Sequence, residues 1–138
     1  MFINRLAFIV IISFNCFGFI NEYKAQKAFK AQKFDDALDN YQKLVIEEPD
    51  NIQNLYNIAN VFYEKKDYEQ AKNYYEKVCN SQINESQKEQ ATFNYANCFA
   101  QLNDLENALK QYENVLKINA NNKRAKSNIE IIKKMLEL

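Results

Sequence analysis

The chain contains almost none of the residues that make tight turns, and this limits its fold more than any other feature. Its 138 residues include one glycine and one proline, whereas average usage would give about ten glycines and seven prolines. Sheet connections depend on Gly, Pro and Asn-Gly turns, so sandwiches, barrels and doubly wound sheets are disfavoured. A glycine-rich phosphate loop is excluded for the same reason. The sequence therefore predicts an all-α protein.

Histidine is absent as well, and its absence removes several classes of enzyme. Histidine-dependent triads, most zinc enzymes and haem ligation all need that side chain. The acidic residues are spread along helix faces, where they can pair with lysines three or four positions away, as Glu69 can with Lys72. No group of Cys, Asp and Glu has metal-ligand spacing. We therefore expect no enzyme, no cofactor, no metal and no small-molecule substrate.

The charges of the chain balance, with 18 basic and 18 acidic residues. A chain with no net charge offers no basic field for nucleic acid, so nucleic acid is not an expected partner. The hydrophobic fraction of 47% is enough to build a core. At this length the natural expectation is one domain.

Residues 1–20 differ in composition from the rest of the chain. They contain one charged side chain, Arg5, followed by a mainly apolar run over Leu6–Ile20. A charged start, an apolar run and a small residue make the layout of a secretory signal. As a helix the run would be about 22 Å long, short of the ~30 Å hydrocarbon core of a bilayer. This length favours a cleaved signal over a permanent membrane segment.

Two other fates of this segment stay open beside cleavage after Gly18. The first is retention as an N-terminal membrane anchor. The second is lipid attachment at Cys16, which is disfavoured because Ser13 and Asn15 stand where a bacterial lipobox usually has Leu and a small residue. The predicted organisation is a signal or membrane segment over 1–20 and a helical domain over 21–138.

The helical domain repeats itself. Three segments have an aromatic residue or Leu, an Ala three positions later and a Tyr four positions after that: Phe34–Tyr41, Tyr68–Tyr75 and Leu105–Tyr112. The alanines of these segments, Ala37, Ala71 and Ala108, are 34 and 37 residues apart, and another alanine lies 12 residues before each, at Ala25, Ala59 and Ala96. A lone helical hairpin cannot bury its apolar stripe, so hairpins of this kind stack. The pattern predicts hairpins that cross at small residues.

This pattern resembles the tetratricopeptide repeat family, whose unit is 34 residues long with small residues and aromatics at fixed positions. The resemblance places repeats at 18–51, 52–85 and 89–122 and a capping helix at 123–138. One departure is Ala28, which stands where repeat 1 should have an aromatic residue. The resemblance implies an α–α superhelix of three helical hairpins plus a C-terminal capping helix.

Helix starts are marked by polar residues that can accept hydrogen bonds from unpaired amides. We assign this role to Asp35, Asp50 and Asp67, and Asn84 with Gln87 has the spacing of a capping box. The expected helices are 21–32, 35–48, 52–65, 68–81, 85–102, 105–118 and 122–138.

The last of these helices has the pattern of a solvating cap, which stacked repeats require. Its apolar residues Ile129, Ile132 and Leu136 are expected to pack on repeat 3. Its outer, wetted face is expected to carry the charged residues Lys123, Arg124, Lys126, Glu130, Lys133, Lys134 and Glu137.

The resemblance also implies where a ligand would bind, because the first helix of each hairpin lines the concave side. In the family, contacts come from positions 2, 5, 6, 9, 12 and 13 of that helix, and in this chain the sixth position is Asn57, Asn94 and, in the capping helix, Asn128. The residues at or near those positions are Gln26, Tyr56, Asn57, Asn60, Tyr63, Phe93, Asn94, Asn97, Gln101 and Asn128. A ladder of carboxamides can donate to and accept from a peptide backbone without demanding charge. Aromatic neighbours add apolar contact. One alternative is that carboxamides on a solvated face of an Asn-rich chain have no such role. Another, implied by the resemblance, is that the asparagines at the sixth position of the repeat, Asn57, Asn94 and Asn128, bond neighbouring helices.

A narrower role in the family, clamping the C-terminal carboxylate of chaperones, does not fit this chain. The clamp positions hold Glu22, Gln26, Asn57, Gln90 and Asn94. Only Asn57 matches, and without cations the carboxylate would lose its charge-assisted hydrogen bonds. A chaperone-tail adaptor is therefore not expected.

Cys79 and Cys98 are the two thiols of the helical domain, and neighbouring helices could bring them together. In an oxidising compartment a disulfide between them is conceivable. The favoured alternative is that both are small buried hydrophobic residues.

The sequence thus predicts a non-catalytic scaffold or assembly factor at the bacterial cell envelope, exported to the periplasm or associated with the membrane. It would bind a protein or peptide segment in the concave groove. Residues 122–134 resemble the cap of small exported tetratricopeptide proteins of Bat-type (aerotolerance) operons, which implies a membrane-protein partner with a von Willebrand factor A-type domain. Two alternatives remain, a lipid-anchored outer-membrane or pilus assembly adaptor and a structural homo-oligomer.

Overall fold

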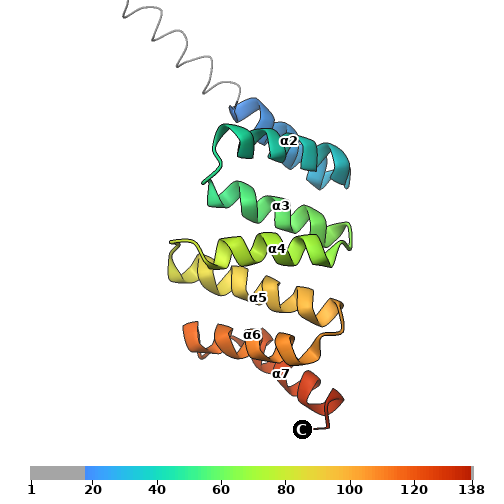
Figure 1. The fold of residues 1–138 in the computed structure, drawn as a ribbon, viewed down its shortest axis with the longest axis vertical. Coiled ribbons are helices and arrows are strands. Elements are labelled where there is room, and N and C mark those ends of the chain that lie inside the picture. The colour runs from blue at the N-terminus through green and yellow to red at the C-terminus, as the bar shows by residue number, and fades with distance from the viewer. Residues whose placement is uncertain (1–17, 138) are drawn as a thin grey trace, which may run out of the picture. The chain divides into compact units, whose positions relative to one another are not determined.

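The computed structural model describes residues 18–137, and each regular element in this part of the chain is a helix. Residues 18–30 form the first helical stretch. It is followed by α2 (Phe34–Glu47), α3 (Ile52–Glu64), α4 (Tyr68–Cys79), α5 (Glu85–Gln101), α6 (Leu105–Ile118) and α7 (Lys123–Met135) (Figure 1). The expected helix bounds agree with these to within three residues, and the all-α hairpin architecture is confirmed. Most of the predicted signal segment, residues 1–17, lies outside the described residues.

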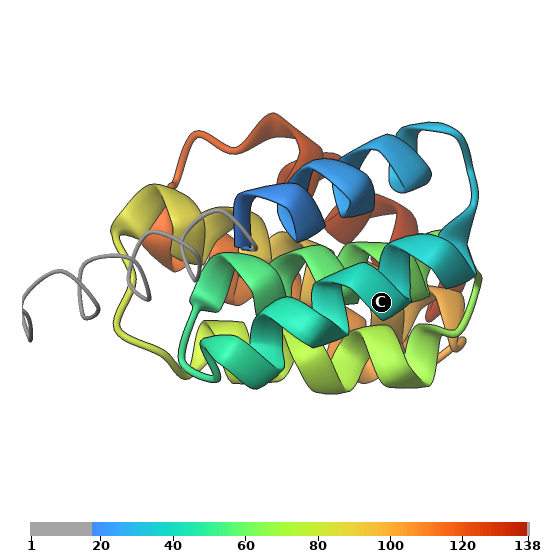
Figure 2. The ribbon, with the colours of Figure 1, turned by 90° about the horizontal axis from the view of Figure 1, so that it is seen from above.

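The chain divides into two compact units, and the division falls between Asn54 and Leu55, in the first turn of α3. In the first unit, residues 18–30 and α2 run antiparallel to one another, as the blue and teal helices of Figure 2 show. One alanine on each of these helices, Ala25 and Ala37, is fully buried. The hairpin predicted from the spacing of these alanines is therefore present.

The second unit contains α3 to α7, with α4 packed on α5, α5 on α6, and α6 on α7. Each of these helices has a fully buried alanine, and α5 has two: Ala59, Ala71, Ala91, Ala96, Ala108 and Ala125. Small residues let two helices approach closely, because the distance between helix axes depends on the side chains at the contact. The seams between the helices are filled by larger side chains, among them Tyr75 and Tyr112, each 2% exposed.

The turn inside each hairpin has the same geometry, although none of the three turns contains glycine. Gln32, Lys66 and Asn103 have positive φ angles of 59°, 63° and 59°. Each amide donates to the carbonyl three residues earlier, and the next amide donates to the carbonyl five residues earlier. This is the Schellman arrangement, in which glycine is usual because other residues are strained in the left-handed conformation. In all three equivalent turns, a residue with a side chain therefore occupies a left-handed position that favours glycine.

Two of the predicted helix starts are confirmed. Asp67 Oδ1 accepts a hydrogen bond from the Gln70 amide at 3.2 Å, at the start of α4. Asn84 and Gln87 form the reciprocal capping box at the start of α5. The sequence analysis missed two further caps, Asp104 before α6 and Asn122 before α7.

The other two predicted capping residues, Asp35 and Asp50, are wrong. Asp35 lies inside the first turn of α2, and the residue at the N-cap is Lys33, whose side chain makes no capping bond. Before α3, the Asn54 amide donates to Asn51 Oδ1 at 3.3 Å, so the acceptor is Asn51 rather than Asp50. In both places an acidic residue close to the cap gave the misleading signal: Asp35 lies two positions after Lys33, and Asp50 one position before Asn51.

The capping helix packs as predicted. Ile129 and Ile132 of α7 are 9% and 4% exposed, and they share a core cluster with Tyr112 and Val115 of α6. Leu136, just beyond α7, packs against the same cluster. Repeat 3 is therefore covered on its outer side by a helix with an apolar inner face.

Neither cysteine of the described part is in a disulfide. Cys98 is fully buried in a cluster with Ala59, Ala71 and Tyr75. Cys79 is half-buried, and its sulfur lies 3.7 Å from the Thr92 hydroxyl. Burial raises the pKa of both thiols, to about 12 for Cys98, so both are neutral thiols rather than reactive thiolates at pH 7. This agrees with the interpretation of both residues as small, buried and mainly apolar.

Candidate functional site

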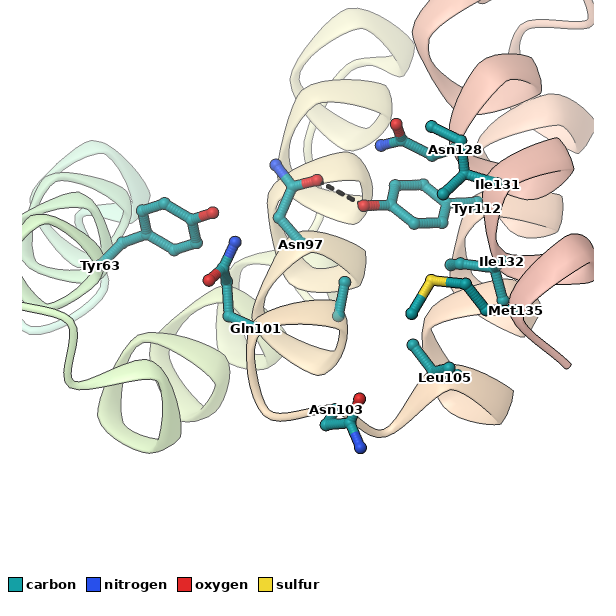
Figure 3. Close-up of a pocket in the computed structure, with 11 residues that line it drawn as sticks. Tyr63, Asn97, Gln101, Asn103, Leu105, Tyr112, Asn128, Ile131, Ile132 and Met135 are labelled. Atoms are coloured by element: carbon teal, nitrogen blue, oxygen red, sulfur yellow. Dashed lines mark hydrogen bonds between the residues drawn. The ribbon is translucent and has the colours of Figure 1, made fainter.

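The candidate site is a hollow of about 280 Å³ in the second unit, which we call the cap-helix pocket (Figure 3). Its lining residues come from Tyr63 of α3, the C-terminal end of α5, two residues of α6 and one face of α7. Four of the predicted site residues line it: Tyr63, Asn97, Gln101 and Asn128. Tyr63 and Gln101 point toward one another across its open side (Figure 3).

Hydrogen bonds from buried tyrosines hold two of the predicted carboxamides. The Tyr112 hydroxyl donates to Asn97 Oδ1 at 2.6 Å, and the Tyr75 hydroxyl donates to Asn60 Oδ1 at 2.5 Å. The two pairs are equivalent in the repeat, since both asparagines and both tyrosines are 37 residues apart. Because one lone pair of each carboxamide oxygen accepts from a hydroxyl, each asparagine offers a partner its pair of N–H donors and the second lone pair of its oxygen.

In a third pair of an asparagine and a tyrosine, the asparagine is the hydrogen-bond donor. Asn94 Nδ2 donates to the Tyr56 hydroxyl at 2.8 Å, and the ring of Tyr56 lies edge-on to that of Tyr75, with 5.7 Å between ring centroids. Asn94 therefore orders an aromatic cluster that spans α3, α4 and α5. This agrees with one of the alternatives drawn from the sequence, that an asparagine at the sixth position of the repeat bonds a neighbouring helix.

The tyrosine hydroxyls at the site are neutral donors at pH 7. Burial raises the pKa of Tyr112 to about 12, against the opposing effects of Asn128 and the Arg124 cation. Burial also raises the pKa of Tyr75 far above its ordinary value. The pKa of Tyr63 is raised by burial and lowered by the Gln101 side chain. The donors that orient Asn60 and Asn97 are thus protonated through the physiological range.

Phe93 does not lie where the sequence analysis expected it. Its ring is 5% exposed, packs against Tyr112 at a centroid distance of 5.5 Å, and belongs to the core cluster of α5, α6 and α7. The Arg124 guanidinium lies over this ring, 4.2 Å from its centroid. What is exposed here is therefore Arg124, which we had placed on the outer, wetted face of the cap.

The remaining predicted residues do not line the cap-helix pocket. Gln26 belongs to the first unit, where its Nε2 donates to Glu22 Oε1 at 3.1 Å. Asn57 is half-buried on α3. Tyr56, Asn60 and Asn94 take part in the hydrogen bonds described above.

The sequence analysis missed the apolar part of the pocket. Ile131 and Met135 of α7 line it and are 53% and 59% exposed. A signal for them existed, because Asn128 was assigned as the sixth residue of a first helix that begins at Lys123. On the same count Arg124, Ile131 and Met135 are residues 2, 9 and 13, which are also ligand positions in the resemblance. Applying the whole frame to the cap would have found all three.

The described residues contain no group of three or more Cys, Asp and Glu side chains able to hold a metal ion. In the same part of the chain, no helix combines the length and apolar character needed to cross a membrane. The groups that line the cap-helix pocket are N–H and O–H donors and carboxamide oxygens beside apolar side chains.

A comparison with protein families identifies this architecture. The model described as the TT21 fifth ARM repeats domain matches residues 24–135. The chain belongs to this family. The match covers the described residues from the first helix to the end of α7, so this TT21-type domain includes the cap-helix pocket and both units.

Solved structures of tetratricopeptide domains are similar to this TT21-type domain. The first such domain of human RPAP3 is 28% identical with a TM-score of 0.73, covering 87% of this chain and 92% of that one. The first such domain of Spaghetti (RPAP3), bound to the HSP90 peptide SRMEEVD, is 25% identical with a TM-score of 0.74, covering 88% and 94%. The N-terminal domain of C. elegans STI-1 shares the fold at 20% identity, with a TM-score of 0.75 and coverage of 84% and 94%. No curated protein sequence matches the chain.

Proposed function

We propose that this TT21-type domain is a non-catalytic interaction module that binds a segment of a partner protein at the cap-helix pocket. The observation that carries the proposal is the exposure of Ile131 and Met135 beside Asn97, whose carboxamide is held by the buried Tyr112. Exposed apolar side chains next to oriented polar groups are typical of protein interaction sites. The similar Spaghetti (RPAP3) domain, which binds a peptide, adds support from a relative.

The size of the pocket favours part of a protein chain over a small molecule. Small-molecule sites have volumes of about 300–1,000 Å³ and enclose most of the ligand. At about 280 Å³ and open on one side, the cap-helix pocket suits one or two side chains. A segment that anchors such side chains here would continue along the surface of the module.

The proposed segment is not a chaperone tail. The HSP90 peptide bound to the Spaghetti domain ends in Glu-Glu-Val-Asp, and a tail of that kind presents several carboxylates. In this chain the clamp positions assigned from the resemblance carry no cation, and one of them is the acidic Glu22. We therefore propose a different segment for this domain.

Site-directed photo-crosslinking in cells tests the module. A benzoylphenylalanine is placed at Gln101, which lines the pocket, and in a matched variant at Lys110, which is exposed on α6. We expect a discrete crosslinked species from the Gln101 variant and none of the same mass from the Lys110 variant. The same products from both positions, or none from either, would contradict the proposal.

We further propose that the module works at a bacterial cell envelope after export. The composition of residues 1–20 supports export, and the resemblance of residues 122–134 to caps of Bat-type proteins supports a membrane-protein partner. Intact mass measurement of the protein from the envelope fraction tests this. A chain that begins at Phe19 is expected, whereas an added lipid mass at Cys16 would indicate the lipid-anchored alternative. A full-length chain in the cytoplasm would contradict export.

A further inference from the structure

The cap helix presents an ordered stripe of side chains beside the pocket. Arg124, Asn128, Ile131 and Met135 are spaced four, three and four residues apart on α7. This spacing places them on one face of the helix. Asn128, Ile131 and Met135 line the cap-helix pocket. The stripe therefore runs from a cation, through a carboxamide, to two exposed apolar side chains.

The packing of Arg124 fixes the position of the cation. Its guanidinium lies over the ring of Phe93, and Phe93 packs on Tyr112, whose hydroxyl bonds Asn97 in the pocket. A guanidinium that contacts a ring through its face keeps its N–H groups available at its edge, where they match the two oxygens of a carboxylate. The Arg124 charge also reaches the pocket, since it lowers the pKa of Tyr112. This arginine is thus placed in advance for an anion.

The surroundings of the pocket favour an acidic partner. None of the described residues that line it carries a carboxylate. The cap helix has five basic residues, Lys123, Arg124, Lys126, Lys133 and Lys134, and one acidic residue, Glu130. Of these, Arg124 lies on the stripe beside the pocket, whereas the helical period places the four lysines on other faces of α7. Charge complementarity of this kind steers and orients an acidic segment.

The distances along α7 set the spacing that such a segment needs. At 1.5 Å per residue, Ile131 and Met135 lie about 10 and 16 Å along the helix axis from Arg124. An extended peptide advances about 3.3 Å per residue, so this span corresponds to roughly three to five residues. One extended segment can therefore contact the cation and the apolar end together.

We propose that the occupant of the cap-helix pocket is an extended partner segment in which an Asp or Glu lies three to five residues from a large apolar side chain. The carboxylate pairs with the Arg124 guanidinium, and the apolar side chain sits against Ile131 and Met135. The proposal rests on the proposed function, because it names the chemistry of the segment which that module binds.

Labelled synthetic peptides test this chemistry on the full chain by fluorescence anisotropy. The first peptide has a Glu and a Leu four residues apart in a Gly/Ser background. In matched peptides Gln replaces the Glu, Ala replaces the Leu, or the Glu and Leu are adjacent. We expect the first peptide to bind about tenfold more tightly than each of the others, since charge-assisted hydrogen bonds and buried apolar contacts both contribute at this scale. Equal binding of all four peptides would overturn the proposal.

Substitutions in the protein assign each contact to its residue. In R124Q the preference for Glu over Gln should vanish, and in M135A the preference for Leu over Ala should shrink, while K110Q, on α6, should change neither. A charge-reversal pair distinguishes loss of the contact from misfolding of the variants. R124E should bind a peptide with Lys in place of the Glu more tightly than the parent protein does. Absence of this rescue, with R124E folded by circular dichroism, would overturn the role of Arg124.

The crosslinking experiment separates failure of this inference from failure of the module. If a partner protein crosslinks at Gln101 but the peptides show no preference, the module stands and the proposed chemistry falls. If the species crosslinked at Gln101 has twice the mass of the chain, the occupant is a second copy, and the partner-segment proposal is overturned. If the peptides show the expected order and the partner's crosslinked sequence contains the acid and the apolar residue at this spacing, the proposal is supported.

Discussion

The two units each contain a hollow, and the hollows differ in charge, since one has an uncharged lining and the other an acidic one. The cap-helix pocket is lined by carboxamides, tyrosines and apolar residues, with Arg124 beside it. The hollow of the first unit, of about 370 Å³, is lined by Glu22, Glu47 and Glu48, and none of its described lining residues is basic. The helical hairpins around both hollows follow the same repeat pattern. The ligand that a repeat protein of this kind accepts thus depends on the side chains at each hollow, not on the fold.

The tyrosines of the two units report the same difference. In the first unit, burial raises the pKa of Tyr41 and the Glu22 carboxylate raises it further. In the second unit, burial raises the pKa of Tyr112, while Asn128 and the Arg124 cation act in the opposite direction. The nearby charge therefore raises the pKa of the tyrosine in the first unit and lowers it in the second, although burial leaves both pKa values raised.

The largest expected effect breaks the cap-helix pocket and leaves the first hollow intact. Ile132 is 4% exposed, so I132A should lower the free energy of unfolding by about 2–5 kcal/mol, through lost burial and the cavity left behind. I131A is the matched control. Because Ile131 is 53% exposed, its stability loss should be below about 1 kcal/mol. Urea unfolding followed by circular dichroism measures both, and equal losses would show that the assignment of α7 faces is wrong.

The next effect is a loss of stability in alkali. A tyrosine whose pKa is raised on folding keeps its full stabilising contribution below about pH 10 and loses it as the pH rises through the folded-state value. For Tyr112 that window is pH 10 to about 12, and the loss is at most about 3 kcal/mol. The free energy of unfolding of Y112F, measured as a function of pH, should fall less steeply in this window than that of the parent protein. An unchanged slope would remove Tyr112 as a cause, and Y41F gives the matching measurement for the first unit.

The smallest effect sharpens the comparison at the turns. Lys33, Asp67 and Asp104 precede α2, α4 and α6 with nearly the same backbone angles, φ from −84° to −87° and ψ from 72° to 74°. Only the two aspartates make a capping bond. K33N should therefore raise the free energy of unfolding by about 0.5–1 kcal/mol. D104A should lower it by a similar amount in the same urea assay, and a loss of stability in K33N would contradict the equivalence of the turns.

Much of the fold could be predicted because its signals are local or periodic. The alanine spacing gave the hairpins, and the Asn84 to Gln87 spacing gave the start of α5. The capping residues of α2 and α3 were misassigned because several polar residues are adjacent in the sequence. Which of them caps the helix depends on backbone angles that composition does not determine. The face of α7 that packs on repeat 3 followed from its apolar period.

The site could be predicted only in part, because its geometry comes from contacts between distant residues. Asn97 was identified, but its hydrogen bond to Tyr112 crosses from one helix to the next and determines which of its atoms a partner can use. Phe93 was expected on the binding surface because an aromatic residue at its position is compatible with either a core or a contact role. Its burial under Arg124 is decided by the capping helix, which begins 30 residues further along the chain.

The left-handed turn residue Asn103 has a consequence for how this domain could evolve. At the equivalent positions of the other two hairpins, glycine would relieve strain without touching the cap-helix pocket. At Asn103 the same change would also delete a carboxamide from the pocket wall. Selection for heat resistance and selection for recognition would thus agree at two turns and conflict at the third. Across variants of this domain, glycine should enter the Gln32 and Lys66 turns more freely than the Asn103 turn wherever the pocket is in use.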